Sequence, residues 1–267
     1  MDSVIKSIVG TCSRRPQNSH TTRSPLPSFQ GALETATFII GPEKIKFVAH
    51  KQFVCYASPP LKAAFNSPFQ EGITQTFEIP NTTPAVFNLW MQWVYQPHVQ
   101  HRASVLRFDA PILMAREWEK PGATTETIDL VFAEFCKNIK LAIDLWGLAE
   151  YLMMPNLQND ALSIMVGLVN TYRTTGKFPF HVHLNLLDDG EEGFVAGGGR
   201  GQTLRRFCID LIAVTVDFGA RSHLDVLDTF SPEDLVDVLA AVARIFGTQA
   251  QVAQRRIPAA DYLIPVD

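Results

Sequence analysis

The sequence predicts an α/β (α+β) fold in which a small β-sheet is flanked by a cluster of helices, with a helical extension toward the C-terminus. Two short β-rich runs meet at a turn dipeptide, and Ser-Pro and Thr-Pro pairs precede segments that have one apolar face. In addition, 46% of the 267 residues are hydrophobic and 19% are charged, which is typical of a globular chain. This length suits one large domain or two small ones.

The first predicted elements form a β-hairpin. Residues 37–40 are a β-rich run that ends at the turn dipeptide Gly41-Pro42. Ile45, Phe47 and Ala49 then take alternate positions, as in a half-buried strand. About four turn residues separate the two runs, a length that favours a hairpin.

Serine or threonine followed by proline marks the start of two helices. The hydroxyl of Ser58 or Thr83 can accept a hydrogen bond from a backbone N–H, and the proline that follows loses none at the first helical position. A helix beginning after His50 precedes them, and residues 76–79 are a third β-like run. The predicted order is strand, strand, helix, helix, strand, helix. The apolar faces of the two capped helices are Leu61, Ala64 and Phe65, then Val86, Phe87, Leu89, Trp90, Trp93 and Val94.

Residues 97–137 are predicted to be an insertion, because prolines and a glycine break a segment of mixed composition. Residues 107–118 could hold a strand or a helix, and a helix is expected to begin near Glu126 and to pass through Phe135. A loop of this length inside a compact domain is expected to be either functional or partly mobile.

A helical hairpin and a helical extension follow the insertion. Met154-Pro155 separates two segments of helical spacing, and residues 185–201 are acidic and then glycine-rich, as in a linker. The extension over residues 202–250 holds two amphipathic helices, the second of which begins at Ser231-Pro232 with acidic residues in its first turn. Neither helix can bury its apolar stripe alone, so each is expected to pack on the core or on a partner.

The N-terminal 30 residues and the bulk charge restrict the function. Four basic residues among serines and threonines could suit a mitochondrial transit peptide, but prolines favour a plain disordered tail. The net charge of −4 gives no reason to expect a nucleic-acid partner, and no apolar run is long enough for a membrane span. The cysteines have no paired spacing, and the sequence favours buried free thiols for three of them. The four are Cys12, Cys55, Cys136 and Cys208.

An ordered series of short runs resembles the BTB/POZ domain, in the shortened form found in many filamentous fungi. It comprises residues 47–51 (FVAHK), 57–59 (ASP), 64–65 (AF), 69–71 (FQE), 93–95 (WVY) and 142–159 (AIDLWGLAEYLMMPNLQN). The resemblance covers roughly residues 35–170, and we assign 31–175 to this domain. Thr35 stands where relatives often have an aspartate near the dimer interface, and Pro60-Leu61 stands where an aromatic pair is usual.

The resemblance also suggests a partner-binding site at Phe69, Gln70 and Glu71. In BTB domains that bind a cullin-type ubiquitin-ligase scaffold, an apolar residue, any residue and a glutamate occupy this loop. An exposed aromatic ring would supply a buried anchor and the carboxylate a directional contact. The alternative is that Phe69 packs back on its own domain and Glu71 is simply solvated.

No residue pattern supports catalysis, a cofactor or a metal site. His98 with His101, and His181 with His183, have spacings that metal ligands can use, but neither pair has a convincing third ligand. His50 is expected to be part of the scaffold. The glycine-rich residues 197–201 lack the lysine and hydroxyl residue of a phosphate loop.

The sequence therefore predicts a non-catalytic protein–protein interaction module of the cytoplasm or nucleus. The leading hypothesis is a substrate adaptor for a cullin-type ligase, with the substrate held by residues 97–137 or 203–250. The alternative is a homo-oligomeric scaffold or transcription-associated protein without a ligase link. An enzyme built around the histidines and the insertion is a third hypothesis, which tight zinc retention would favour.

Overall fold

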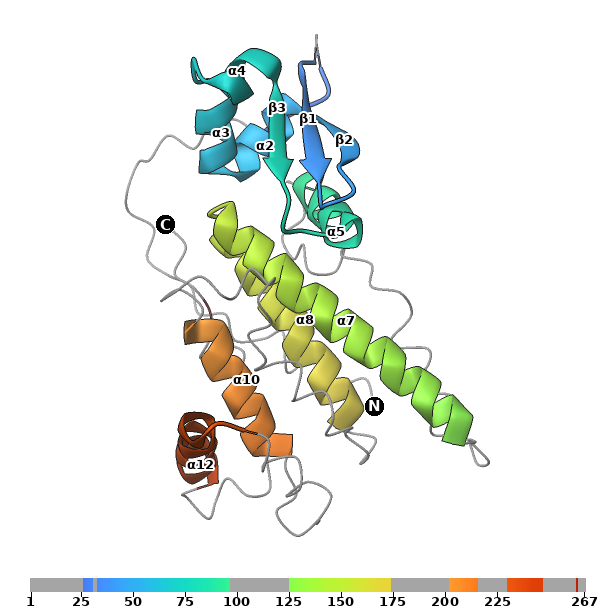
Figure 1. The fold of residues 1–267 in the computed structure, drawn as a ribbon, viewed down its shortest axis with the longest axis vertical. Helices are drawn as coiled ribbons and strands as arrows, with labels where there is room; N and C mark the ends of the chain where they lie inside the picture. The colour runs from blue at the N-terminus through green and yellow to red at the C-terminus, as the bar shows by residue number, and fades with distance from the viewer. Residues whose placement is uncertain are drawn as a thin grey trace.

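The computed structural model describes residues 26–30, 33–96, 125–173, 202–215, 230–246 and 263. The sheet and its short helices form one end of the molecule, the α7–α8 hairpin extends away from them, α10 lies beside the hairpin, and α12 lies against α10 (Figure 1). The elements in chain order are β1 (Thr35–Ile40), β2 (Ile45–His50), α2 (Lys51–Ala57), α3 (Pro59–Phe65), α4 (Gln70–Thr74), β3 (Thr76–Ile79), α5 (Pro84–Val94), α7 (Thr125–Tyr151), α8 (Pro155–Arg173), α10 (Gln202–Thr215) and α12 (Pro232–Phe246).

The sheet has three strands in the order β2-β1-β3. β1 pairs antiparallel with β2, with Phe38 opposite Phe47, and parallel with β3, with Phe38 opposite Phe77. Gly41 has a φ of +70° in the β1–β2 turn, where a side chain would be strained. The predicted hairpin and third strand are confirmed, and so is the mixed α/β class.

The predicted helix caps are confirmed. The side chain of Ser58 accepts from the Leu61 N–H at 3.3 Å, and that of Thr83 accepts from the Val86 N–H at 3.3 Å. Ser58 also donates its hydroxyl proton to the Leu152 carbonyl at 2.8 Å, so a local cap joins α3 to the end of α7.

The core is built around β1 and α5. Phe38 lies 5.1 Å from Phe87 and 5.5 Å from Trp90 between ring centroids, and all three side chains are fully buried. The Trp90 indole N–H donates to the Met154 sulfur at 3.2 Å, which ties α5 to the start of α8. The α7–α8 hairpin and one face of α10 share this same buried cluster.

Two predicted boundaries are wrong. The helix expected from near Glu126 through Phe135 is confirmed as the first half of α7, one helix of 27 residues that continues beyond residue 137, so the predicted insertion ends inside a helix. The helix continues across residue 137 because no proline or glycine interrupts residues 125–146. Residues 97–124, including 107–118, lie outside the described part of the chain.

The predicted tail also extends too far. Pro27 is buried and the Phe29 ring lies 4.5 Å from that of Phe53, so residues 26–30 pack against the domain rather than forming a tail. Residues 1–25 and the predicted linker 185–201 lie outside the described residues.

Both helices of the predicted extension are confirmed as α10 and α12. The Ser231 hydroxyl accepts from the Asp234 N–H at 3.2 Å, which caps α12 as the sequence predicts. α10 packs on the main core through one face and on α12 through another, so the extension is attached to the domain by α10.

Candidate interaction site

The short helix α4 determines where the predicted partner-binding residues lie. Phe69 is its N-cap residue and Gln70 and Glu71 form its first turn, so these residues belong to a helix rather than to the predicted loop. Sequence periodicity missed α4 because five residues are too few to show a helical repeat.

Hydrogen bonds and one close approach hold α4 in place. The Ser67 hydroxyl accepts from the Phe69 N–H at 3.2 Å, and Gln75 donates to the carbonyls of Phe65 at 3.0 Å and Gly72 at 2.6 Å. A Cβ atom at Gly72 would lie 1.9 Å from the Ser67 carbonyl oxygen. Only glycine therefore fits at this position of α4.

Two apolar side chains of α4 are largely exposed. Phe69 is 71% exposed and Ile73 is 76% exposed, and their spacing of four positions places both on one side of the helix. The exposure of Phe69 contradicts the alternative interpretation of the sequence, in which this side chain packs back on its own domain. Of the two other predicted site residues, Gln70 is exposed and Glu71 is half-buried.

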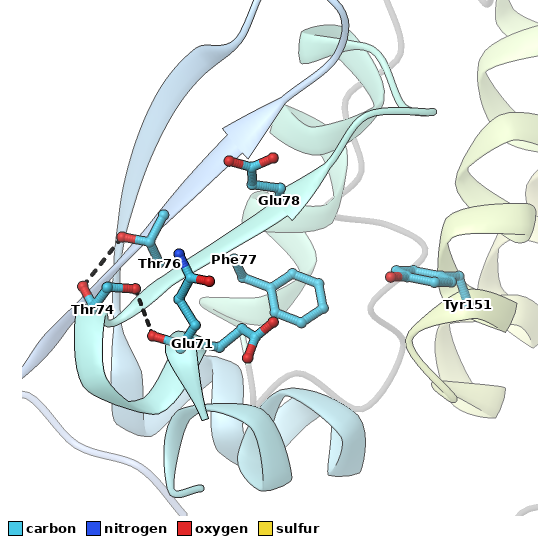
Figure 2. A pocket seen from close by; sticks show the side chains of 7 residues that line it. Glu71, Thr74, Thr76, Phe77, Glu78 and Tyr151 are labelled. Carbon is cyan, nitrogen blue, oxygen red and sulfur yellow. Dashed lines mark hydrogen bonds between the residues drawn. The ribbon is translucent and has the colours of Figure 1, made fainter. Parts of the chain in front are cut away.

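A pocket of about 470 Å³ opens beside α4 and β3. Figure 2 shows Glu71 extending toward the ring of Phe77, while Tyr151 faces that ring from the other side of the opening. Two glutamates and no lysine or arginine line it, so the pocket has negative character. Its residues are Gln70, Glu71, Thr74, Thr76, Phe77, Glu78 and Tyr151.

Tyr151 reaches this site because α7 ends there. Met153 takes a left-handed φ of +51°, and the Met154 N–H donates to the Ala149 carbonyl at 2.8 Å, which closes the helix before α8 begins. Tyr151 is 49% exposed and Met153 is 58% exposed. Sequence reasoning did not assign Tyr151 to the site, since nothing local signals that it lines a pocket with residues of β3.

The histidine predicted to be structural has a scaffold role. The His50 backbone N–H donates to the Tyr95 hydroxyl oxygen at 2.9 Å, and His50 Nδ1 lies 2.9 Å from the same oxygen. One hydroxyl group thus joins the end of β2 to the end of α5. The other four candidate histidines, His98, His101, His181 and His183, lie outside the described residues.

The structure describes the side chains of two cysteines. Cys55 is half-buried and Cys208 is fully buried, and neither is in a disulfide. Burial raises the pKa of the Cys55 thiol, although Lys51 opposes the shift, and burial raises the pKa of Cys208 to about 12. Both thiols are thus poor nucleophiles at neutral pH. Cys12 and the side chain of Cys136 lie outside the described part of the chain.

Within the described ranges, no group of three or more histidine, cysteine, aspartate or glutamate side chains is arranged to hold a metal ion. The same residues include no helix that is both long and apolar enough to cross a bilayer.

Comparison with known proteins finds a family match at the sheet end of the molecule. The family model described as the BTB/POZ domain matches residues 29–124. The match contains β1 to α5, including Phe69, Gln70 and Glu71, and it ends before α7. No curated protein matches the chain.

Proposed function

Because the chain contains a BTB/POZ domain, a domain that mediates protein–protein interaction, we propose that it is an adaptor that binds a cullin-type ubiquitin-ligase scaffold. BTB/POZ domains are generally non-catalytic, which agrees with the proposal. The adaptor would act in the cytoplasm or nucleus, where cullin ligases operate.

The observation that carries the proposal is the exposure of Phe69 beside Glu71. An aromatic side chain that is 71% exposed contributes little to the stability of its own domain and is available as an anchor for a partner. Ile73 extends the apolar surface by one turn, and Glu71 offers an acceptor for a directional hydrogen bond. Tyr151 and Met153 provide further exposed apolar area at the end of α7.

An adaptor also needs a surface for its substrate, and α12 offers one. Val236 is 64% exposed and Leu239 is 59% exposed, on a helix at the opposite end of the molecule from α4 (Figure 1). A substrate held there would leave α4 accessible to the scaffold.

The test is titration calorimetry of the full chain with a cullin N-terminal region. We expect stoichiometric binding that falls at least tenfold in Phe69→Ala and in Glu71→Ala, since truncating a hot-spot residue near the centre of an interface costs about 2 kcal/mol or more. Val236→Ala, which truncates an equally exposed side chain on α12, is the matched control and should bind normally. Binding that is unchanged in both α4 variants would refute the assignment.

A homo-oligomeric scaffold is the second candidate function, and Phe29 favours it. This side chain is 60% exposed and its ring is stacked on Tyr95 with a centroid distance of 6.0 Å, so it forms a second exposed apolar surface. The scaffold hypothesis predicts a stable dimer by light scattering that Phe29→Ala dissociates. A monomer at all concentrations would exclude it.

A further inference from the structure

The sheet has two edges, β2 and β3, and neither pairs with another described strand. An unpaired edge presents a row of backbone donors and acceptors to which an extended chain can add. The side chains that line each edge determine whether such an addition is favoured.

Hydrogen bonds to β1 reveal which groups of β3 point outward. The Thr37 N–H donates to the Gln75 carbonyl at 2.8 Å, and the Gly41 N–H donates to the Ile79 carbonyl at 3.0 Å. Backbone groups alternate in direction along a strand, so Gln75, Phe77 and Ile79 face β1. The N–H and C=O groups of Thr76 and Glu78 therefore point away from the sheet.

The same reasoning applied to β2 gives a contrasting edge. The Lys51 N–H donates to the Glu34 carbonyl at 2.9 Å, so the even-numbered residues of β1 pair with β2. In the observed register, the outward-pointing backbone groups of β2 belong to Lys46 and Val48. An edge lysine is a common device against strand addition.

The β3 edge has the opposite charge and lies beside the pocket. Glu78 is on the strand and Glu71 is across the opening on α4, and the rings of Phe77 and Tyr151 also line the pocket (Figure 2). Two carboxylates and two aromatic rings are complementary to a lysine or arginine side chain. A strand added at β3 would run directly past this pocket.

We propose that an extended, basic segment of a partner protein adds to β3 as a fourth strand and places a lysine or arginine side chain in the pocket. The backbone groups of Thr76 and Glu78 supply the ladder hydrogen bonds, and Glu71 and Glu78 select the basic residue. This inference rests on the assignment of the α4–β3 surface as protein-binding, and it specifies the chemistry of one partner.

The test begins with a library of random heptapeptides displayed on phage and selected on the full chain. We expect enrichment of peptides with one lysine or arginine among β-branched residues, because such residues favour the extended conformation. An enrichment of acidic peptides, of sequences with helical periodicity, or of nothing above background would overturn the proposal.

Variants then separate the charge from the backbone contribution. With a fluorescein-labelled peptide from the selection, Glu78→Gln should weaken binding about tenfold by removing one carboxylate. Glu78→Pro should weaken binding further because it also removes the outward N–H, while the bonds to β1 remain. Val48→Pro makes the same backbone change at the opposite edge and should bind normally. Equal loss in Val48→Pro and Glu78→Pro would overturn the assignment to β3.

Amide hydrogen exchange provides a readout that does not depend on a variant folding. In the peptide complex, exchange at the Thr76 and Glu78 amides should slow at least tenfold, and exchange at Phe77 and Ile79 should change little. Protection at Lys46 and Val48 instead would place the peptide at the wrong edge and refute the proposal.

Two further results separate this inference from the proposed function and from self-association. Phe69→Ala should reduce cullin binding and leave peptide binding intact, whereas Glu78→Pro should do the reverse. If light scattering shows an oligomer that Glu78→Pro dissociates, a second copy occupies the edge and the partner-segment proposal is wrong.

Discussion

The sheet end and the C-terminal helix α12 are held to the rest of the molecule by different forces. Around β1 and α5, large aromatic side chains such as Phe38, Phe87 and Trp90 are fully buried and touch one another. Between α10 and α12, the buried residues are fewer and smaller, and include Ala213 and Ala241. The apolar area buried at the second contact is correspondingly lower, so it contributes less stability.

Ion pairs between α10 and α12 add to the smaller amount of apolar packing at this second contact. Arg205 of α10 lies 2.5 Å from both Asp234 and Asp237 of α12, and Arg244 of α12 pairs with the buried Asp210 of α10. Charge pairs are screened by salt and apolar packing is not. The comparison shows that the two ends of one chain should respond to different perturbations, with α10 as the element that joins them.

The largest effect is expected for Trp90→Ala in the aromatic core. The fully buried indole fills space between β1 and α8 and donates its N–H to Met154, so its removal should cost about 3–5 kcal/mol of unfolding free energy. Urea denaturation followed by circular dichroism measures this loss. A cost below about 1 kcal/mol would contradict the packing described, and Val236→Ala on the exposed face of α12 is the control.

A smaller, local effect is expected for Arg244→Ala. Asp210 is only 2% exposed in its side chain, and without Arg244 its charge loses a principal partner, which we expect to cost about 1–3 kcal/mol because Arg244 itself is partly exposed. Hydrogen exchange in α12 should quicken while exchange in β1 and α5 stays constant. Adding Asp210→Asn to the Arg244→Ala variant should restore part of the lost stability, because it removes the buried charge. Faster hydrogen exchange throughout the described chain, instead of in α12 alone, would contradict a local role.

The next effect is a loss of stability at alkaline pH caused by Cys208, which lies on the face of α10 that packs on the main core. Its folded pKa is raised to about 12 by burial, so the unfolded thiol ionises at lower pH than the folded one. The folded state then binds more protons, and stability falls as pH rises above the unfolded pKa. With an unfolded pKa of 9.0, this ionisation lowers the free energy of unfolding at pH 10 by about 1.4 kcal/mol.

The measurement for Cys208 is the unfolding free energy at pH 8 and pH 10 for the wild type and Cys208→Ala. The variant should lose less stability between the two values, and the difference isolates the thiol from other groups that titrate there. Identical slopes would show that Cys208 is not buried as described.

The smallest effect is expected from salt. Raising the ionic strength to about 1 M shortens the Debye length to about 3 Å, which should weaken the exposed Arg205 pairs by less than about 1 kcal/mol. Limited proteolysis should then cleave α12 faster and leave the sheet end unaffected. Equal sensitivity at both ends would remove the contrast between them.

The sequence by itself determined the elements whose signals are local. Ser58, Thr83 and Ser231 cap helices as expected because a hydroxyl and the N–H that it accepts are only three residues apart. A β-rich run before a turn dipeptide predicted β1, and alternation predicted β2, since both signals are also local. The BTB/POZ resemblance rested on an ordered series of short residue runs, and the family model matches residues 29–124.

Only the tertiary structure decided how those elements meet. α4 escaped prediction because its short turn depends on the Gln75 hydrogen bonds and on the absence of a side chain at Gly72. Tyr151 and Phe77 line one pocket, and Thr76 and Glu78 form a sheet edge, because the fold brings together segments far apart in the sequence. Local periodicity reports which face of an element is apolar, but it carries no information about which distant element covers that face or leaves it open.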